Sequence, residues 1–174
     1  MSFKNNLIQA CLLSALFAGS AMADPVTLTI NGRVIAAACT TGTSASYTID
    51  LGQSIAASAL NTAASGSTYV PQDVVLSNCP VGTNTVTATF SGTADSANPT
   101  MYANSTGAGY ATNVAVELQN ATASTDVGNS GTMTVNTDAS RKATFPLKAR
   151  AYSKNGGTTP GNISTVVMMN FTYN

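Results

Sequence analysis

Few side chains in this chain of 174 residues could do acid–base, nucleophilic or metal chemistry. The sequence contains no histidine, so it lacks the usual general base and the commonest metal ligand. Glu117 is its only glutamate, and the aspartates are scattered without the spacing of a calcium-binding loop. No S-x-x-K motif pairs a serine with a lysine. We therefore expect no enzymatic activity, no cofactor and no metal site.

The first 23 residues have the pattern of a secretory signal peptide. Lys4 gives a short positive region, residues 7–18 are mainly apolar, and Ala21, Met22 and Ala23 form a small-x-small cleavage site. We expect cleavage before Asp24, with export of residues 24–174. Cys11 is lost with the signal peptide.

The exported part then keeps one pair of cysteines, Cys39 and Cys79. An even number of cysteines in an exported chain predicts a disulfide, and the alternative is two free, buried thiols. Closing a loop of this length would stabilise the fold by about 4 kcal/mol on the chain-entropy model.

Charged residues make up only 8% of the sequence, far below the usual share of about a quarter. Lysine and arginine total seven, aspartate and glutamate total seven, and no basic run occurs. This composition argues against binding to nucleic acid or to a membrane surface. The polar residues are mainly threonine, serine and asparagine, which is typical of an extracellular β protein.

The C-terminal stretch alternates between apolar and polar residues with a period of two, which predicts a strand. It begins after Gly161, and one face would carry Ile163, Thr165, Val167, Met169, Phe171 and Tyr173. No further strand follows it in the sequence. We therefore expect its free side to be covered by an earlier part of the chain or by another chain.

The segment after the cleavage site alternates even more cleanly. Val26, Leu28, Ile30 and Val34 share one face with Gly32, and the opposite face has no apolar residue. The alternation predicts one continuous strand, in which Gly32 would lie where a facing group leaves no room for a Cβ atom. Two alternatives remain: Asn31 and Gly32 could form a hairpin turn, or the segment could fold back as the domain's own first strand.

Short alternating segments fill the rest of the chain. We expect strands at 47–51, 70–77, 86–90, 114–118, 133–135 and 143–152, a loop with one helical turn at 52–66 and a long connection at 91–109. Pro146 cannot donate a ladder hydrogen bond, so it should lie at an edge or a bulge. The pattern is typical of an all-β, immunoglobulin-type sandwich. Without tryptophan, the core cannot be of the antibody kind.

Several motifs, taken together and in order, resemble the pilins of chaperone–usher fimbriae, those of type 1 in particular. They are the alternating segment from Val26 to Val34, the 40-residue step from Cys39 to Cys79, and four later stretches. Those stretches are residues 76–82 (LSNCPVG), 90–95 (FSGTAD), 145–150 (FPLKAR), and the closing strand with Gly161 and the penultimate Tyr173. The resemblance covers the whole exported chain and is greatest to the minor adaptor subunit of the tip fibrillum, next to the tip adhesin.

The resemblance implies a sandwich that lacks its last strand, with a groove along the C-terminal strand. Residues 24–38 would form a donor-strand extension, and residues 39–174 would form the pilin domain. A periplasmic chaperone would fill the groove first and the extension of a neighbouring subunit would then replace it, with an outer-membrane usher exporting the fibre to the cell surface. The partners implied are pilins, the chaperone, the usher and the tip adhesin.

Two other functions are compatible with parts of the sequence. The chain could be an adhesin-type domain that recognises a host glycan, or a self-contained sandwich with an unknown ligand. Tip adhesins resemble a lectin domain followed by a pilin domain, which is about twice this length, and no aromatic cluster in the sequence indicates a sugar site. We therefore favour a structural fibre subunit.

Overall fold

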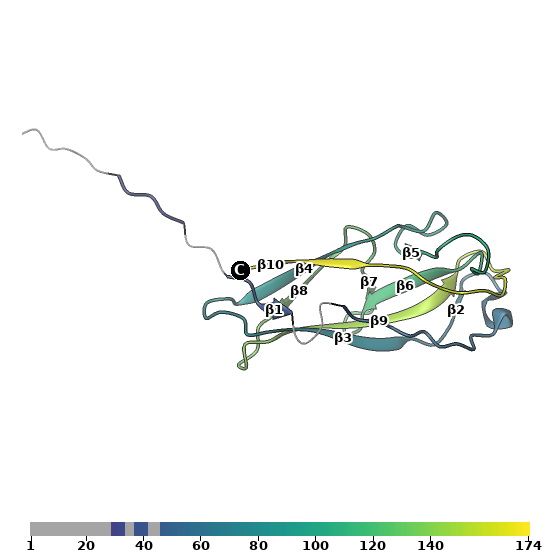
Figure 1. The fold of residues 1–174 in the computed structure, drawn as a ribbon, viewed down its shortest axis with the longest axis horizontal. Helices are drawn as coiled ribbons and strands as arrows, with labels where there is room; N and C mark the ends of the chain where they lie inside the picture. The colour runs from purple at the N-terminus through teal and green to yellow at the C-terminus, as the bar shows by residue number, and fades with distance from the viewer. Residues whose placement is uncertain (1–28, 34–36, 42–45) are drawn as a thin grey trace, which may run out of the picture. The chain divides into compact units, whose positions relative to one another are not determined.

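The computed structural model describes residues 29–33, 37–41 and 46–174 (Figure 1). The chain divides into two compact units, Met1–Arg33 and Val34–Asn174. The expected boundary between residues 38 and 39 stays a prediction. The predicted signal peptide and three of the predicted donor-strand residues, Val26, Leu28 and Val34, lie outside the described residues. Among the described residues, no helix is both long and apolar enough to cross a membrane.

In the described part of the second unit, the strands form two antiparallel sheets. The larger has seven strands, with the central order β1-β3-β9-β6-β5, while β2 pairs with β9 and β7 with β6. The smaller has three strands in the order β10-β4-β8. The bounds are β1 Thr40–Thr41, β2 Ser65–Gly66, β3 Val70–Ser77, β4 Thr85–Ser91, β5 Tyr102–Ala103, β6 Ala115–Asn120, β7 Thr125–Asp126, β8 Thr132–Asn136, β9 Ala143–Ser153 and β10 Met168–Tyr173.

The longest strand, β9, follows directly from its alternating sequence. The residues that were expected to face inward (Phe145, Leu147, Ala149 and Ala151) are at most 3% exposed. Lys148 and Arg150 lie on the opposite face and are partly exposed. Since β9 pairs with β3 on one side and β6 on the other, it forms the centre of the larger sheet.

Most of the expected strands are confirmed within a residue or two, and so is the helical turn, a 3-10 turn at Ala57–Leu60. The expected connection at 91–109 also contains a short strand, β5, that the sequence analysis missed. Its Tyr102 is fully buried and donates a 2.9 Å hydrogen bond to the Val127 carbonyl oxygen. A two-residue strand is too short to produce an alternating pattern, so no periodicity indicated it.

The prediction of a strand at 47–51 was wrong. No ladder pairing forms there, although Ile49 and Leu51 are partly buried against the core. The Tyr47 hydroxyl is 3.3 Å from the Val75 carbonyl oxygen and 3.4 Å from the Val75 nitrogen, so a side chain makes the contact to β3. Alternation predicted the inward side chains of Ile49 and Leu51, but Tyr47 is exposed. Alternation also cannot supply the neighbouring backbone that a ladder needs.

The expectation that Pro146 lies at an edge or a bulge also needs correction. Pro146 lies inside β9, opposite Asp73 of β3. Its carbonyl oxygen accepts a 2.8 Å hydrogen bond from Ala121, just beyond Asn120, where pairing with β6 ends. Because the nitrogen and carbonyl of a strand residue point to the same side, the missing N–H faces the side where the ladder has stopped. Proline is tolerated at this position for that reason.

The main core lies between the two sheets. Phe90 and Val86 of β4 and Phe145 of β9 are fully buried within it. The Cys39–Cys79 disulfide is present and buried in the same cluster, where it ties the segment before β1 to the end of β3.

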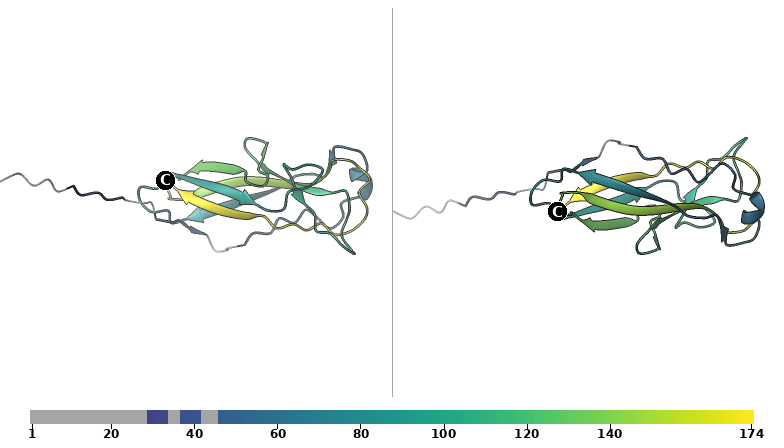
Figure 2. Two further views of the ribbon diagram at one scale, coloured as in Figure 1. Left: turned by 90° about the horizontal axis from the view of Figure 1, so that it is seen from above. Right: turned by 90° about the horizontal axis from the view of Figure 1, so that it is seen from below.

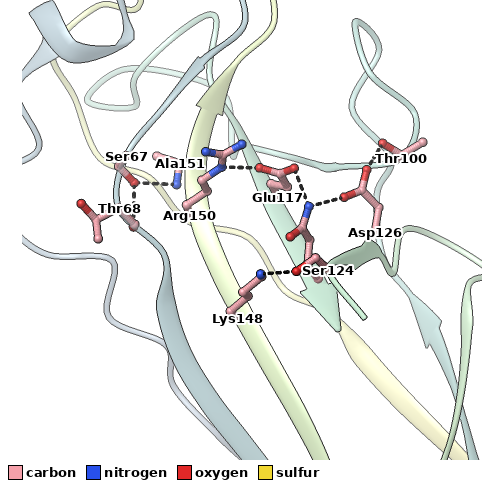
Figure 3. Close-up of polar contacts among 10 residues, drawn as sticks. Ser67, Thr68, Thr100, Glu117, Ser124, Asp126, Lys148, Arg150 and Ala151 are labelled. Atoms are coloured by element: carbon pink, nitrogen blue, oxygen red, sulfur yellow. Dashed lines mark hydrogen bonds and ion pairs between the residues drawn. The ribbon is translucent and has the colours of Figure 1, made fainter. Parts of the chain in front are cut away.

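A polar network covers the outer face of the larger sheet (Figure 3). The buried Glu117 carboxylate pairs with Arg150 and accepts a 3.0 Å hydrogen bond from Gln119, which also donates to Asp126. The Arg150 guanidinium lies 4.4 Å from the ring centroid of Tyr69. Burial, followed by the neighbouring Glu117 carboxylate, raises the pKa of Tyr69 to about 12. The network thereby joins side chains from β6, β7, β9 and the segment before β3.

Candidate functional site

The C-terminal strand β10 is an edge strand. It pairs only with β4, in a register that runs from Met168 opposite Ser91 to Tyr173 opposite Val86. Within the described residues no strand pairs with its other side, so a row of backbone N–H and C=O groups is left without a ladder partner there. Such an edge is able to accept a further strand.

The two faces of the C-terminal segment lie as the alternation indicates. The six predicted inward residues are all partly buried, and the alternating residues between them are exposed. Phe171 packs against Phe145 of β9, with ring centroids 5.4 Å apart. Figure 2 shows this segment, in yellow, running along the sandwich to the chain end marked C. The inward set is Ile163, Thr165, Val167, Met169, Phe171 and Tyr173.

The first part of this segment, residues 161–167, is held by hydrogen bonds outside a regular ladder. Ser164 accepts a hydrogen bond from the Ser105 N–H at 2.9 Å and donates its own N–H to Asn104 at 2.7 Å. Gly161 lies against the backbone of Ala111, and a Cβ atom at this position would clash with the Ala111 nitrogen. Gly161 therefore sets where the C-terminal segment enters the sandwich.

A long groove of about 1220 Å³ opens beside this segment. One wall is formed by residues 158–171 and the other by residues 46–53 together with Ile55, Ala57 and Leu60. Its floor consists of apolar core residues from both sheets: Val74, Leu76, Phe90, Val116, Leu118, Leu147 and Ala149. The groove exceeds the roughly 300–1,000 Å³ of ordinary small-molecule pockets, which fits an extended peptide better.

The second wall contains the functional residues that the sequence analysis missed. Tyr47, Ile49 and Leu51 were expected to be an ordinary core strand, yet they line the groove opposite the C-terminal segment. Their alternation was the available signal. It could not indicate that the space between this segment and β10 is left open.

The chemistry of the groove suits the binding of an extended strand. The groove offers apolar side chains, an unpaired strand edge, and no histidine or free thiol. A peptide with apolar residues at every second position could bury them in the floor and pair its backbone with β10. Burial raises the pKa of Tyr173 above its usual value, in agreement with its partly apolar surroundings.

In the N-terminal unit, Ile30 and Gly32 are the donor-strand candidates that the structure describes. Ile30 is 84% exposed, and a Cβ atom on Gly32 would have no neighbour within 4 Å. Residues 29–33 form no strand. The apolar side of this segment is therefore not used within the described structure, and its role as a donor strand stays a prediction.

An all-β sandwich with an open groove along its last strand defines the class of the protein as an incomplete immunoglobulin-like domain of the pilin type. The family model described as "Fimbrial protein" matches residues 28–174. The chain belongs to the fimbrial protein family.

The chain matches curated fimbrial proteins over nearly its whole length. It is 40% identical to Protein FimG of Escherichia coli strain K12, over 98% of this chain and 97% of that protein. It is 37% identical to the S-fimbrial adhesin protein SfaS of Escherichia coli O6:K15:H31, over 99% of both chains. The chain is accordingly a fimbrial subunit and not an enzyme.

Solved structures confirm the predicted fold class. A chain from a chaperone–usher pilus superposes with a TM-score of 0.64 at 24% identity, covering 90% of this chain and 100% of that chain. The P pilus rod subunit PapA superposes with a TM-score of 0.61 at 22% identity, covering 79% of this chain and 100% of that chain.

The relative named as an adhesin is matched over 99% of both chains, so length alone does not separate this chain from that relative.

Proposed function

We propose that this chain is a minor adaptor subunit of a type 1-like fimbria and polymerises by donor-strand exchange. The groove beside β10 would first hold a strand of a periplasmic chaperone and then the N-terminal segment of the next subunit. An outer-membrane usher would export the assembled fibre to the cell surface, where it supports adhesion. The adaptor position next to the tip adhesin rests on the resemblance of the sequence motifs.

The observation that carries the proposal is the open apolar groove along an unpaired strand edge. The exposed Ile30 supports the other half of the exchange, because it belongs to an alternating segment with no partner among the described residues. Burying Val26, Leu28, Ile30 and Val34 in a neighbour's groove would contribute roughly 1.5–3 kcal/mol each. Each ladder hydrogen bond would add about 1 kcal/mol net.

Deleting residues 24–34 tests whether donor and acceptor are separate. The truncated chain should still co-purify with a chaperone and accept a strand, because its groove is intact. It should stop fibre growth, since it has nothing to insert into the subunit ahead. A deletion that prevents folding would contradict the proposal, because the segment would then belong to its own domain.

The matched experiment changes the acceptor. Replacing Val167 and Phe171 together by asparagine should leave the N-terminal segment intact but prevent chaperone co-purification, with degradation of the subunit. If the double variant binds chaperone as well as the unchanged chain does, the groove is not the acceptor site.

The copy number of the subunit tests the adaptor position separately. Immunogold labelling and quantitative mass spectrometry of purified fimbriae should find very few copies of this chain per fibre, near the tip. Labelling along the whole shaft would identify a rod subunit and reject the adaptor role, while donor-strand exchange would remain tested by the two variants above.

A further inference from the structure

A second, smaller cavity of about 410 Å³ lies in the same unit. Its lining comes from one stretch, residues 94–98, Met101, 103–107 and 110–115, and from a part of the chain that is distant in the sequence, with Tyr152, Lys154 and Asn155. Ala111 contributes to both this cavity and the groove. The volume falls within the roughly 300–1,000 Å³ that is usual for small-molecule sites.

Two tyrosines and a lysine bring polar groups to this cavity. Tyr110 and Tyr152 are partly buried, and Lys154 is exposed at the rim. Among the described residues, neither tyrosine hydroxyl has a hydrogen-bond partner, and the Lys154 ammonium forms no ion pair. These groups are available to a ligand, whereas the Tyr102 hydroxyl nearby in the chain is occupied by the Val127 carbonyl.

The framework of the cavity is held in place before any ligand binds. Asp95 accepts hydrogen bonds from the N–H groups of Ala97 (3.0 Å) and Asn98 (2.9 Å), which fixes the loop at the rim. The buried Asn104 donates to the carbonyl oxygens of Ala111 (2.8 Å) and Asn162 (3.1 Å). Ligand binding would therefore require little ordering of the protein.

The Tyr152 ring is also held. It lies on β9 beside Arg150, whose guanidinium carbon is 5.3 Å from the ring centroid. Arg150 is fixed in turn by its ion pair with the buried Glu117 (Figure 3). The polar network on the outer face of the larger sheet thus orients a tyrosine of the cavity.

The lining matches the chemistry of sugars, because it combines aromatic rings, free hydroxyls, amides and an ammonium with apolar side chains such as Met101 and Val114. A pyranose ring has C–H faces that pack on aromatic rings, and its hydroxyls both donate and accept hydrogen bonds. We propose that this cavity is a carbohydrate-binding site, so that the subunit contributes to glycan recognition as well as to fibre structure.

The test begins with the mature chain in its soluble purified form, with chaperone bound if one co-purifies, applied to an array of neutral and acidic oligosaccharides. We expect selective binding to a subset of glycans, which is then quantified by titration with the best-bound oligosaccharide. Chaperone alone is the control. Binding no glycan above that control would overturn the proposal, and it would leave donor-strand exchange unaffected.

Two variants then locate the site. Tyr110→Ala removes a ring and a hydroxyl, and Ala97→Trp fills the cavity from an exposed position without removing an internal contact. Each should weaken glycan binding by about tenfold or more, the equivalent of losing one or two good contacts. Lys154→Ala should weaken it less, and Lys142→Ala, outside the cavity lining, should leave it unchanged.

Thermal unfolding of each variant separates a lost site from a lost fold. If Ala97→Trp is as stable as the unchanged chain and still binds the glycan with the same affinity, the glycan binds elsewhere and the cavity assignment is wrong.

Discussion

Strands β9 and β10 have the same alternating pattern in the sequence but differ in burial. The inward residues of β9 are at most 3% exposed, whereas those of the C-terminal segment are only partly buried. The strands also differ in their neighbours, because β9 pairs on both sides and β10 on one. The difference shows that the inward face of the C-terminal segment is incompletely covered on the side where β10 lacks a neighbour.

A pair of phenylalanines gives the largest expected contrast. Phe145 on β9 is fully buried, and Phe171 from the C-terminal strand packs against it. Phe145→Ala should reduce the free energy of unfolding by about 3–5 kcal/mol, whether or not the groove is occupied. Phe171→Ala should cost less in the unoccupied protein and more once a strand fills the groove.

Urea denaturation with and without a donor peptide measures both variants. Equal losses for Phe145→Ala and Phe171→Ala in the unoccupied protein would mean that the C-terminal strand is as fully packed as β9, and the comparison would fail.

Two residues of the C-terminal segment isolate the groove face. Val167 is partly buried, packs against the core and lines the groove, whereas Thr172 is exposed on the opposite face and does not line the groove. Val167→Asn should weaken donor-peptide binding by about 2 kcal/mol, and Thr172→Asn should change it by less than about 0.5 kcal/mol. Peptide titration followed by fluorescence anisotropy gives both values. The opposite ranking would place the peptide on the outer face of the sheet.

Gly32, in the predicted donor strand, tests the donor side of the exchange. Gly32→Leu should leave the chain's own stability unchanged, because nothing surrounds Gly32 in the described structure. It should slow incorporation into a neighbouring subunit about tenfold if Gly32 enters a tight part of the acceptor groove, where overpacking costs about 1–3 kcal/mol. Incorporation at the normal rate would indicate that Gly32 serves only as a turn residue.

The smallest effect, absent at neutral pH, concerns the buried Tyr102. Burial raises its pKa to about 12, while an unfolded tyrosine ionises near pH 10. Above about pH 10 the unfolded state therefore loses the proton first, and the free energy of unfolding should fall as pH rises towards about 12. Tyr102→Phe should make this fall shallower in urea denaturation series. An unchanged slope would show that Tyr102 does not contribute to it.

Local periodicity was sufficient to predict the sandwich and the faces of its long strands. The inward residues of β9 and the C-terminal segment follow from a period of two, and the motifs around Cys79, Phe90 and Phe145 indicated the family. The two predictions that failed concerned pairing between segments. A strand at 47–51 would have needed a ladder partner, and the position of Pro146 inside β9 is possible because β6 ends beside it. Periodicity describes one segment at a time, so it predicts neither which segments pair nor where a neighbouring strand ends.

The same limit applies to the sites. The half of the groove lined by Ile163, Val167 and Phe171 was predicted, but the opposite wall was not, because only the folded chain brings Tyr47 and Leu51 across from it. No aromatic cluster was visible in the sequence, since Tyr110 and Tyr152 come from separate segments that meet only at the second cavity.

Hydrogen exchange at β10 tests the central claim most directly. The measurement follows the backbone amides of residues 163–173 in the mature chain, with and without a peptide of residues 24–34, and uses the β9 amides as the internal reference. We expect the β10 amides that point away from β4 to exchange quickly without the peptide and to become strongly protected with it, while β9 stays unchanged. Amides on that edge that are already as protected as those of β9, and unaffected by the peptide, would contradict an open acceptor groove.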